Sequence, residues 1–156
     1  MYENDTAHQV DIGYVGEVTE IDTGIIADLL NQGYVPVIAP IGMGEHGESY
    51  NINADYVAAE IAGALHAEKM LLLTDVEGVY KDFADKGSLI SQLCMAEVRE
   101  YIRSGVIEGG MIPKVEACLR ALEAGAHKAH IIDGRLAHSI ILEIFTSRGI
   151  GTMVLP

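Results

Sequence analysis

The sequence is poor in cysteine and has no long apolar run. Cys94 and Cys118 are its only cysteines, and they form no CxxC pair. No basic start precedes an apolar segment of the kind found in signal peptides, and no apolar run is long enough to span a bilayer. These absences favour a reducing, cytoplasmic location.

Positive charge is also scarce. The 156 residues contain 10 lysines and arginines against 23 aspartates and glutamates, which gives a formal net charge of −13. Such a charge repels phosphate backbones and anionic lipids, so it argues against nucleic-acid and membrane partners. A site for a small anion would have to depend on nearby lysines and helix N-termini.

The sequence gives little support for a metal site. The spacing of His127 and His130 is compatible with metal binding, but no cysteine lies near enough to complete a structural zinc set. We therefore expect no metal bound by the protein alone.

Apolar patterns alternate between helix and strand periods along the chain, and the length suits one domain. A helix is expected from Asp22 to Gly33, and another begins at Asn53. The almost entirely apolar run 34–41 predicts a central parallel strand buried on both faces, followed by a loop at 42–50. Further helices are expected at 95–103, 111–124 and 136–146, further strands at 69–74, 129–133 and 152–155, and a strand pair or ribbon at 11–21. This alternation predicts an α/β layered sandwich.

Residues 51–55, Asn-Ile-Asn-Ala-Asp, lie between a strand and the first turn of a helix. In open α/β sheets this is where ligands bind. Asn51 and Asn53 can donate amide N–H groups to a carboxylate or phosphate, and Asp55 can hold a lysine or a hydrated metal ion. The alternative is an ordinary capping sequence, because Asn and Asp are common N-caps.

Residues 109–114 place glycines before a lysine at the start of a helix. Gly109 and Gly110 allow backbone amides to approach a ligand, and Lys114 lies near the positive end of the helix dipole. Phosphate fits such a segment. A plain glycine turn, with Pro113 in the first helical turn and a surface lysine, is the alternative. Residues 74–80 also follow a strand at the expected ligand edge, although a plain turn would fit them too.

Together these segments resemble the amino acid kinase family, over essentially the whole chain. Within the family they are most similar to the members that phosphorylate N-acetyl-L-glutamate. The stretches that carry the resemblance are 13–18, 33–42, 50–55, 73–80, 109–115 and 131–135. The resemblance implies a carbamate kinase-like fold, an open and mainly parallel sheet sandwiched by helices, with residues 1–156 forming a single domain that corresponds to the C-terminal, ATP-binding lobe.

The resemblance also implies a reaction, in which the γ-phosphoryl group of ATP passes to the side-chain carboxylate of N-acetyl-L-glutamate for arginine synthesis, leaving ADP. Lys114 matches the lysine that steadies the transferring group, Asp55 the carboxylate that orients the catalytic lysines, and Asn51 and Asn53 positions that hold the acetylated amino acid. Mg²⁺ would arrive with the nucleotide. The expected nucleotide-binding residues are Thr74, Asp75, Val76, Gly78, Val79, Gly109, Gly110 and Met111.

The C-terminal stretch 138–152 resembles the arginine-inhibited members of this family. The resemblance implies an L-arginine effector site at His138, Glu143, Gly149 and Gly151. A carboxylate can pair with a guanidinium group, which fits Glu143. The alternative is a capped amphipathic helix whose histidine faces water.

The family's N-terminal substrate lobe, with its glycine-rich lysine loop and substrate-binding arginine, has no counterpart in this sequence. We therefore expect nucleotide binding with poor turnover. Phe83 also departs from the family, which more often has proline there, and should change loop stiffness. A stand-alone nucleotide- or arginine-binding module, and another carboxylate or carbamate kinase of the same fold, stay open as alternatives. An open sheet with an unpaired edge and exposed apolar surface predicts a homo-oligomer.

Overall fold

The computed structural model describes residues 2–3, 6–7, 12–146 and 149–156. Its centre is a four-stranded sheet of order β5-β7-β8-β6. The strands are β5 (Met70–Thr74), β6 (Gln92–Cys94), β7 (Ala129–Asp133) and β8 (Thr152–Leu155). β5 pairs with β7 and β6 with β8 in parallel, whereas β7 and β8 run antiparallel. The sheet is therefore mixed.

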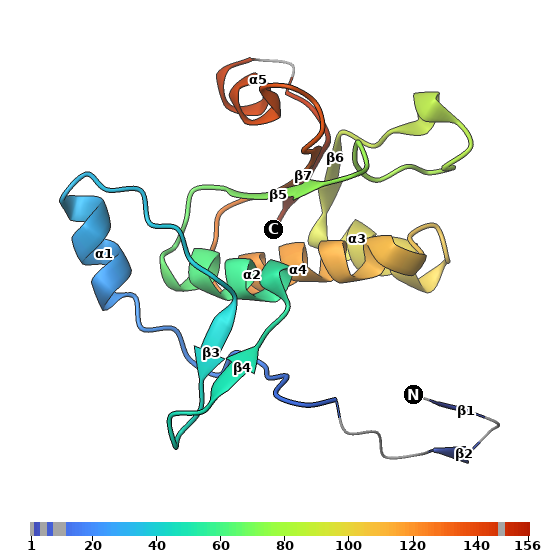
Figure 1. The fold of residues 1–156 in the computed structure, drawn as a ribbon. Coiled ribbons are helices and arrows are strands. Elements are labelled where there is room, and N and C mark those ends of the chain that lie inside the picture. Colours follow the sequence, from blue (N-terminus) through green and yellow to red (C-terminus); the bar gives the residue numbers. More distant parts are fainter. Residues whose placement is uncertain (1, 4–5, 8–11, 147–148) are drawn as a thin grey trace.

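Helices cover both faces of this sheet, as Figure 1 shows. One face carries α2 (Ala54–Ala64), α3 (Met95–Arg103) and α4 (Ile112–Glu123), and α5 (Ser139–Phe145) lies on the other side. Two short 3₁₀ turns, η1 (Lys86–Ser88) and η2 (Gly109–Met111), complete the connections. The predicted α/β sandwich is confirmed. No helix in the described part of the chain combines the length and apolarity needed to cross a membrane.

The core lies between the sheet and α4. Val115, Leu119 and Leu122, which recur on one face of this helix, are all buried. α2 contributes only small buried residues, Ala59, Ala62 and Gly63, so it can approach α4 closely. A methyl group built on Gly63 would lie 2.2 Å from the Cβ of Ala124. The two helices therefore lie side by side (Figure 1) with backbone almost in contact.

The N-terminal third projects away from this core (Figure 1). It contains the two-residue strands β1 (Tyr2–Glu3) and β2 (Thr6–Ala7), helix α1 (Gly24–Asn31), and the hairpin of β3 (Ile41–Met43) and β4 (Ser49–Asn51). The predicted start and end of α1 are close to the structure, since Asp22 Oδ1 accepts a hydrogen bond from Gly24 N–H and Gly33 has a φ of +81°. None of the residues of α1 is buried.

Two strand predictions in this region are wrong. Residues 34–40 form no strand, and Val35 and Val37 are 87% and 97% exposed. A strand needs a hydrogen-bonded neighbour, and none of the described residues forms a ladder with this run. In 12–21 only Val15 forms a single bridge, to Asn51, and Asp11 lies outside the described residues. The expected loop 42–50 is instead the β3–β4 hairpin, turning at Gly47 with a φ of +87°.

α5 is shorter than the predicted helix 136–146, and its orientation differs from that of an ordinary amphipathic helix. Ser139 and Glu143 are its buried residues. Its apolar residues Ile140, Ile141, Ile144 and Phe145 are 43–79% exposed. The helix therefore presents its carboxylate, not its apolar side, to the sheet.

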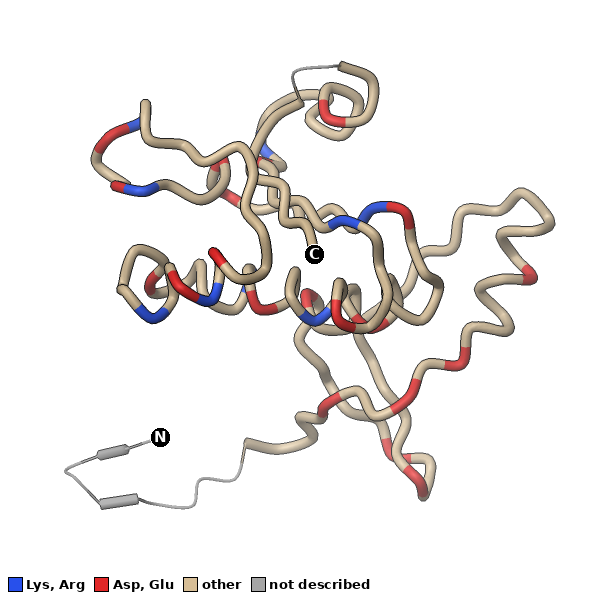
Figure 2. The backbone as a smooth tube through the Cα atoms, turned by 180° about the vertical axis from the view of Figure 1, so that it is seen from behind, with Lys and Arg blue, Asp and Glu red and all other residues tan. Residues whose placement is uncertain are grey.

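Basic residues are confined to the part of the chain that starts at Lys69, and the projecting N-terminal part has none (Figure 2). All ten lysines and arginines lie at or after Lys69. Figure 2 accordingly shows acidic but no basic positions along the projecting N-terminal segment and its hairpin. The excess negative charge is therefore concentrated on the part of the molecule that also exposes the most apolar side chains.

Candidate functional site

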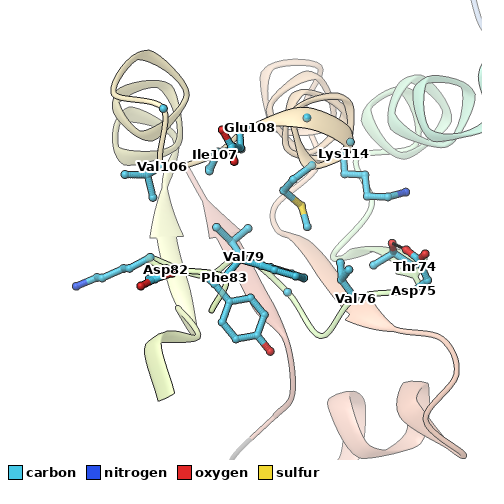
Figure 3. Close-up of a pocket in the computed structure, with 17 residues that line it drawn as sticks. Thr74, Asp75, Val76, Val79, Asp82, Phe83, Val106, Ile107, Glu108 and Lys114 are labelled. Atoms are coloured by element: carbon cyan, nitrogen blue, oxygen red, sulfur yellow. Dashed lines mark hydrogen bonds between the residues drawn. The ribbon is translucent and has the colours of Figure 1, made fainter. Parts of the chain in front are cut away.

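A cavity of about 980 Å³ opens beside the carboxyl end of β5. The loop that follows this strand, residues 74–83, forms one wall, and residues 105–114, which include η2 and the start of α4, form the other (Figure 3). All eight residues predicted to bind a nucleotide line it, as does Lys114: Thr74, Asp75, Val76, Gly78, Val79, Gly109, Gly110 and Met111. Parallel strands characteristically place ligand sites at this edge.

The first wall is fixed to the sheet by Thr152, a fully buried residue of β8. Its hydroxyl accepts a hydrogen bond from Val79 N–H at 2.8 Å and donates one to the carbonyl oxygen of Ile90 at 2.6 Å. Gly78 has a φ of +153°, and a Cβ there would lie 2.5 Å from this hydroxyl. Glycine is therefore required for the loop to pack against β8.

Lys114 and Asp55 meet at one end of the cavity. Lys114 is in the first turn of α4 and Asp55 in the first turn of α2, and Nζ lies 3.4 Å from Oδ2. Both side chains are about one quarter exposed, at 25% and 29%. The pair thus stands at the first turns of two helices, where the positive end of the helix dipole favours an anion. The predicted catalytic pair is brought together by the close packing of α2 on α4.

The two asparagines are placed differently. Asn53 caps α2, because its Oδ1 accepts hydrogen bonds from the N–H groups of Asp55 at 2.9 Å and Tyr56 at 3.3 Å. Asn51 is exposed in β4, and its backbone bonds to Tyr14 and Gly16. Neither lines the cavity. The structure therefore gives Asn53 the capping role that the sequence left as an alternative.

The predicted set of nucleotide-binding residues omitted several residues that line the cavity. They extend the same two segments and are Tyr80, Lys81, Asp82 and Phe83 in one wall and Gly105, Val106, Ile107 and Glu108 in the other. Their position next to the predicted motifs was the available signal. What the sequence could not show is that the two segments face each other.

A second cavity, of about 540 Å³, surrounds Glu143 on the opposite side of the sheet from α4. Glu143 Oε1 accepts a hydrogen bond from Lys69 Nζ at 2.6 Å, and Oε2 accepts one from Ile150 N–H at 2.9 Å. Gly149 and Gly151 line this cavity with Glu143. His138 does not, because it is exposed at the N-cap of α5 with a φ of +62°.

Lys69 and His130 complete the surroundings of Glu143, and neither was predicted. His130 Nδ1 lies 2.9 Å from Glu143 Oε1, and neither ring nitrogen makes a hydrogen bond within the described part of the chain. Burial lowers the pKa of His130 despite the nearby carboxylate. Burial opposes ionisation of Glu143 too, yet Lys69, Ile150 N–H and His130 together lower its pKa. Near neutral pH Glu143 is therefore a carboxylate and His130 a neutral imidazole.

Comparison with known proteins agrees with this architecture. Residues 3–133 match the amino acid kinase family. The chain belongs to the amino acid kinase family. The acetylglutamate kinase of Moorella thermoacetica is 60% identical over 147 residues, which are 94% of this chain and 50% of that protein. The acetylglutamate kinase of Heliobacterium modesticaldum is 59% identical over 93% of this chain and 49% of its own length. The chain thus spans about half the length of the curated relatives it matches.

Solved structures of other proteins show a similar fold. N-acetylglutamate synthase from Neisseria gonorrhoeae, complexed with coenzyme A and L-arginine, has a TM-score of 0.84 at 27% identity, over 94% of this chain and 33% of that one. Giardia carbamate kinase has a TM-score of 0.64 at 20% identity over 85% of this chain and 46% of that one, which shows a shared fold alone.

Proposed function

We propose that this chain carries the nucleotide-binding and phosphoryl-transfer part of an acetylglutamate kinase. The single observation that carries the proposal is the Lys114–Asp55 pair at the end of a cavity lined by every residue predicted to bind ATP. The identity of 60% to a curated acetylglutamate kinase supports the choice of N-acetyl-L-glutamate as the acceptor.

The reaction would form a bond between a carboxylate oxygen of N-acetyl-L-glutamate and the γ-phosphorus of ATP, while the bond from that phosphorus to the bridging oxygen of ADP breaks. No covalent enzyme intermediate is needed. Catalysis then consists mainly of bringing two anions into line and offsetting the charge on the transferring group. Lys114 supplies positive charge, and Asp55 holds its ammonium group in place.

Mg²⁺ would offset further phosphate charge. The part of the chain that the structure describes contains no group of three or more His, Cys, Asp or Glu side chains able to hold a metal. This arrangement fits a metal ion carried mainly by the nucleotide phosphates, with few protein ligands, as is usual for Mg²⁺ at ATP sites.

Turnover by the chain alone should be low. Of the residues that line the cavity, only Lys81 and Lys114 carry positive charge. Two lysines, of which one is paired with Asp55, can offset only part of the charge of a triphosphate and a carboxylate. We therefore expect nucleotide binding to be easier to detect than acyl phosphate formation.

Calorimetric titration with Mg-ATP tests the proposal. The wild-type chain should bind Mg-ATP, and Lys114→Ala should weaken binding about ten-fold, the effect of losing a charge-assisted contact of about 1.4 kcal/mol. Lys128→Ala is the matched control, because Lys128 pairs with Glu68 and does not line the cavity. An absence of Mg-ATP binding by the wild-type chain would contradict the proposal.

Acceptor specificity needs a separate assay. The half of the Moorella relative outside the matched region can be added to this chain, and acyl phosphate can be trapped with hydroxylamine. Product from N-acetyl-L-glutamate, but not from carbamate or aspartate, is the expected result. Mg-ATP binding with no product from any acceptor would favour the stand-alone nucleotide-binding module.

L-arginine binding at the second cavity is a second candidate function. Glu143 is a buried carboxylate in a cavity with Gly149 and Gly151, and the similar Neisseria synthase structure contains L-arginine. A guanidinium group would have to share Glu143 with Lys69. Titration with L-arginine should therefore give binding that Glu143→Gln removes, and L-lysine serves as the control ligand.

A further inference from the structure

Different side chains line the two ends of the cavity beside β5 (Figure 3). Lys114, Thr74 and Asp75 lie together at one end in Figure 3, and Lys114 is the residue paired with Asp55. Val106 and Ile107 lie further along, away from Lys114, with Asp82 and Glu108 near them. In the proposed function Lys114 receives the phosphates, so the base of the nucleotide extends toward Val106 and Ile107.

Phe83 is the lining residue best suited to meet that base. Tyr80 and Phe83 are the aromatic residues of the lining, and they differ sharply in exposure, with Tyr80 6% and Phe83 67% exposed. Figure 3 shows Phe83 on the wall opposite Ile107 and Glu108. A largely exposed aromatic ring on a cavity wall leaves a flat apolar surface in water, which a second flat ring could cover.

The ring is held in place by its neighbours. Phe83 packs edge-to-face with Tyr80, at 5.7 Å between centroids and 83° between planes. Lys86 Nζ lies 5.0 Å from the centroid of Phe83, and Glu77 Oε2 accepts a hydrogen bond from that ammonium group at 3.1 Å. A ring that is already ordered loses little conformational freedom when a ligand stacks on it.

The backbone around Phe83 is also tied down. Asp82 N–H donates to Ser88 Oγ at 3.0 Å, and Ala84 N–H donates to Asp82 Oδ1 at 2.9 Å. Lys81 N–H donates to the carbonyl oxygen of Ser88 at 3.1 Å. These hydrogen bonds hold the backbone of the loop that carries the Phe83 ring.

We propose that Phe83 is the platform on which the nucleobase of ATP stacks. The proposal rests on the proposed function, because it requires a nucleotide whose phosphates lie at Lys114. Stacking on an aromatic face depends on the π-surface of the base and not on its hydrogen-bonding pattern. Phe83 should therefore contribute to the affinity for any purine nucleotide and contribute nothing to the affinity for the phosphate chain alone.

The test compares a ligand that has a base with one that lacks it. Mg-ATP and Mg-tripolyphosphate are titrated calorimetrically into the wild-type chain, Phe83→Ala and Phe83→Tyr. Phe83→Ala should weaken Mg-ATP binding about ten-fold, within the range for loss of one base–aromatic stack. It should leave Mg-tripolyphosphate binding unchanged, and Phe83→Tyr should bind both ligands like the wild type.

The outcomes separate the two proposals. Wild-type binding of Mg-ATP that Phe83→Ala leaves intact overturns the platform but not the nucleotide site. Equal weakening of both ligands also overturns it, because the effect would then come from the loop and not from the base. No Mg-ATP binding by the wild-type chain overturns the nucleotide site and the platform with it. Phe83 is exposed, so its variants should fold, and circular dichroism melting curves check that they do.

Discussion

At the scale of single residues, segment 51–55 contains one side chain that caps a helix and another that forms an ion pair. Asn53 uses its side chain to cap α2, whereas Asp55, two residues later, points to Lys114. The cap fixes where α2 begins, and the start of the helix in turn fixes the position of Asp55. The capping residue therefore helps to determine the geometry of the proposed catalytic pair.

Replacement of the two asparagines should have unequal effects on stability. Asn53→Ala removes two hydrogen bonds at the N-cap and should lower the free energy of unfolding by about 1 kcal/mol. Asn53→Asp keeps the acceptor and should remain near the wild type. Asn51→Ala, at an exposed position, is the matched control and should change stability little. Urea denaturation measures all three, and equal losses for Asn51→Ala and Asn53→Ala would contradict the capping role.

At the scale of elements, the close crossing of α2 and α4 brings the proposed catalytic pair together. Gly63→Ala places a methyl group 2.2 Å from the Cβ of Ala124, so the helices must move apart. Alanine normally stabilises a helix interior relative to glycine, but overpacking should reverse the sign and cost about 1–3 kcal/mol. Gly110→Ala, where a methyl group meets no atom within 4 Å, is the control. Thermal melting would contradict this reasoning if Gly63→Ala proved as stable as the wild type.

The attachment of α5 to the sheet through Glu143 should make stability depend on pH. The pKa of His130 is lowered in the folded protein, so protonation below its ordinary pKa of 6.5 favours the unfolded chain. The pKa of Glu143 is lowered as well, and its contribution is lost as pH falls below 4.5. Both groups therefore give full stability at neutral pH and less in acid.

Denaturation at pH 7.0 and 5.5 measures the contribution of His130 to stability. Of His130 and Glu143, only His130 begins to lose its contribution in that range. The wild-type chain should lose stability between the two values, and His130→Leu should show a smaller loss. His127→Gln, at an exposed histidine, should behave like the wild type. A pH dependence unchanged in His130→Leu would assign the effect to other groups.

Local sequence signals predicted where helices begin and end better than they predicted which elements contact each other. Asn53 marks the start of α2 and Gly33 the end of α1 because caps and left-handed terminators act over a few residues. The apolar run 34–41 has the composition of a strand, but the strand prediction failed because pairing depends on a neighbour that composition does not specify. Lys69 and His130 were missed for a related reason. Their meeting with Glu143 depends on the register of β5 and β7 and on the orientation of α5.

At the scale of the whole molecule, the projecting N-terminal part combines two opposing tendencies. Its apolar side chains Tyr34, Val35, Val37 and Met43 are 61–97% exposed, which favours association. All the charge on the same part is negative, so two copies that approach through it repel each other. Self-association through this surface, which we propose, should therefore be limited by electrostatics.

Salt should strengthen self-association of the chain. The screening length falls from about 10 Å at 0.1 M salt to about 3 Å at 1 M, which removes most repulsion between exposed carboxylates while leaving apolar attraction intact. Sedimentation velocity should therefore show more dimer or larger species at 1 M than at 0.1 M NaCl. Val37→Asp should reduce the association, because Val37 is 97% exposed on the projecting segment. Phe145→Asp, at a 79% exposed apolar position on α5, should not. A monomer at both salt concentrations would argue against self-association, and loss of association in Phe145→Asp alone would move the contact surface to α5.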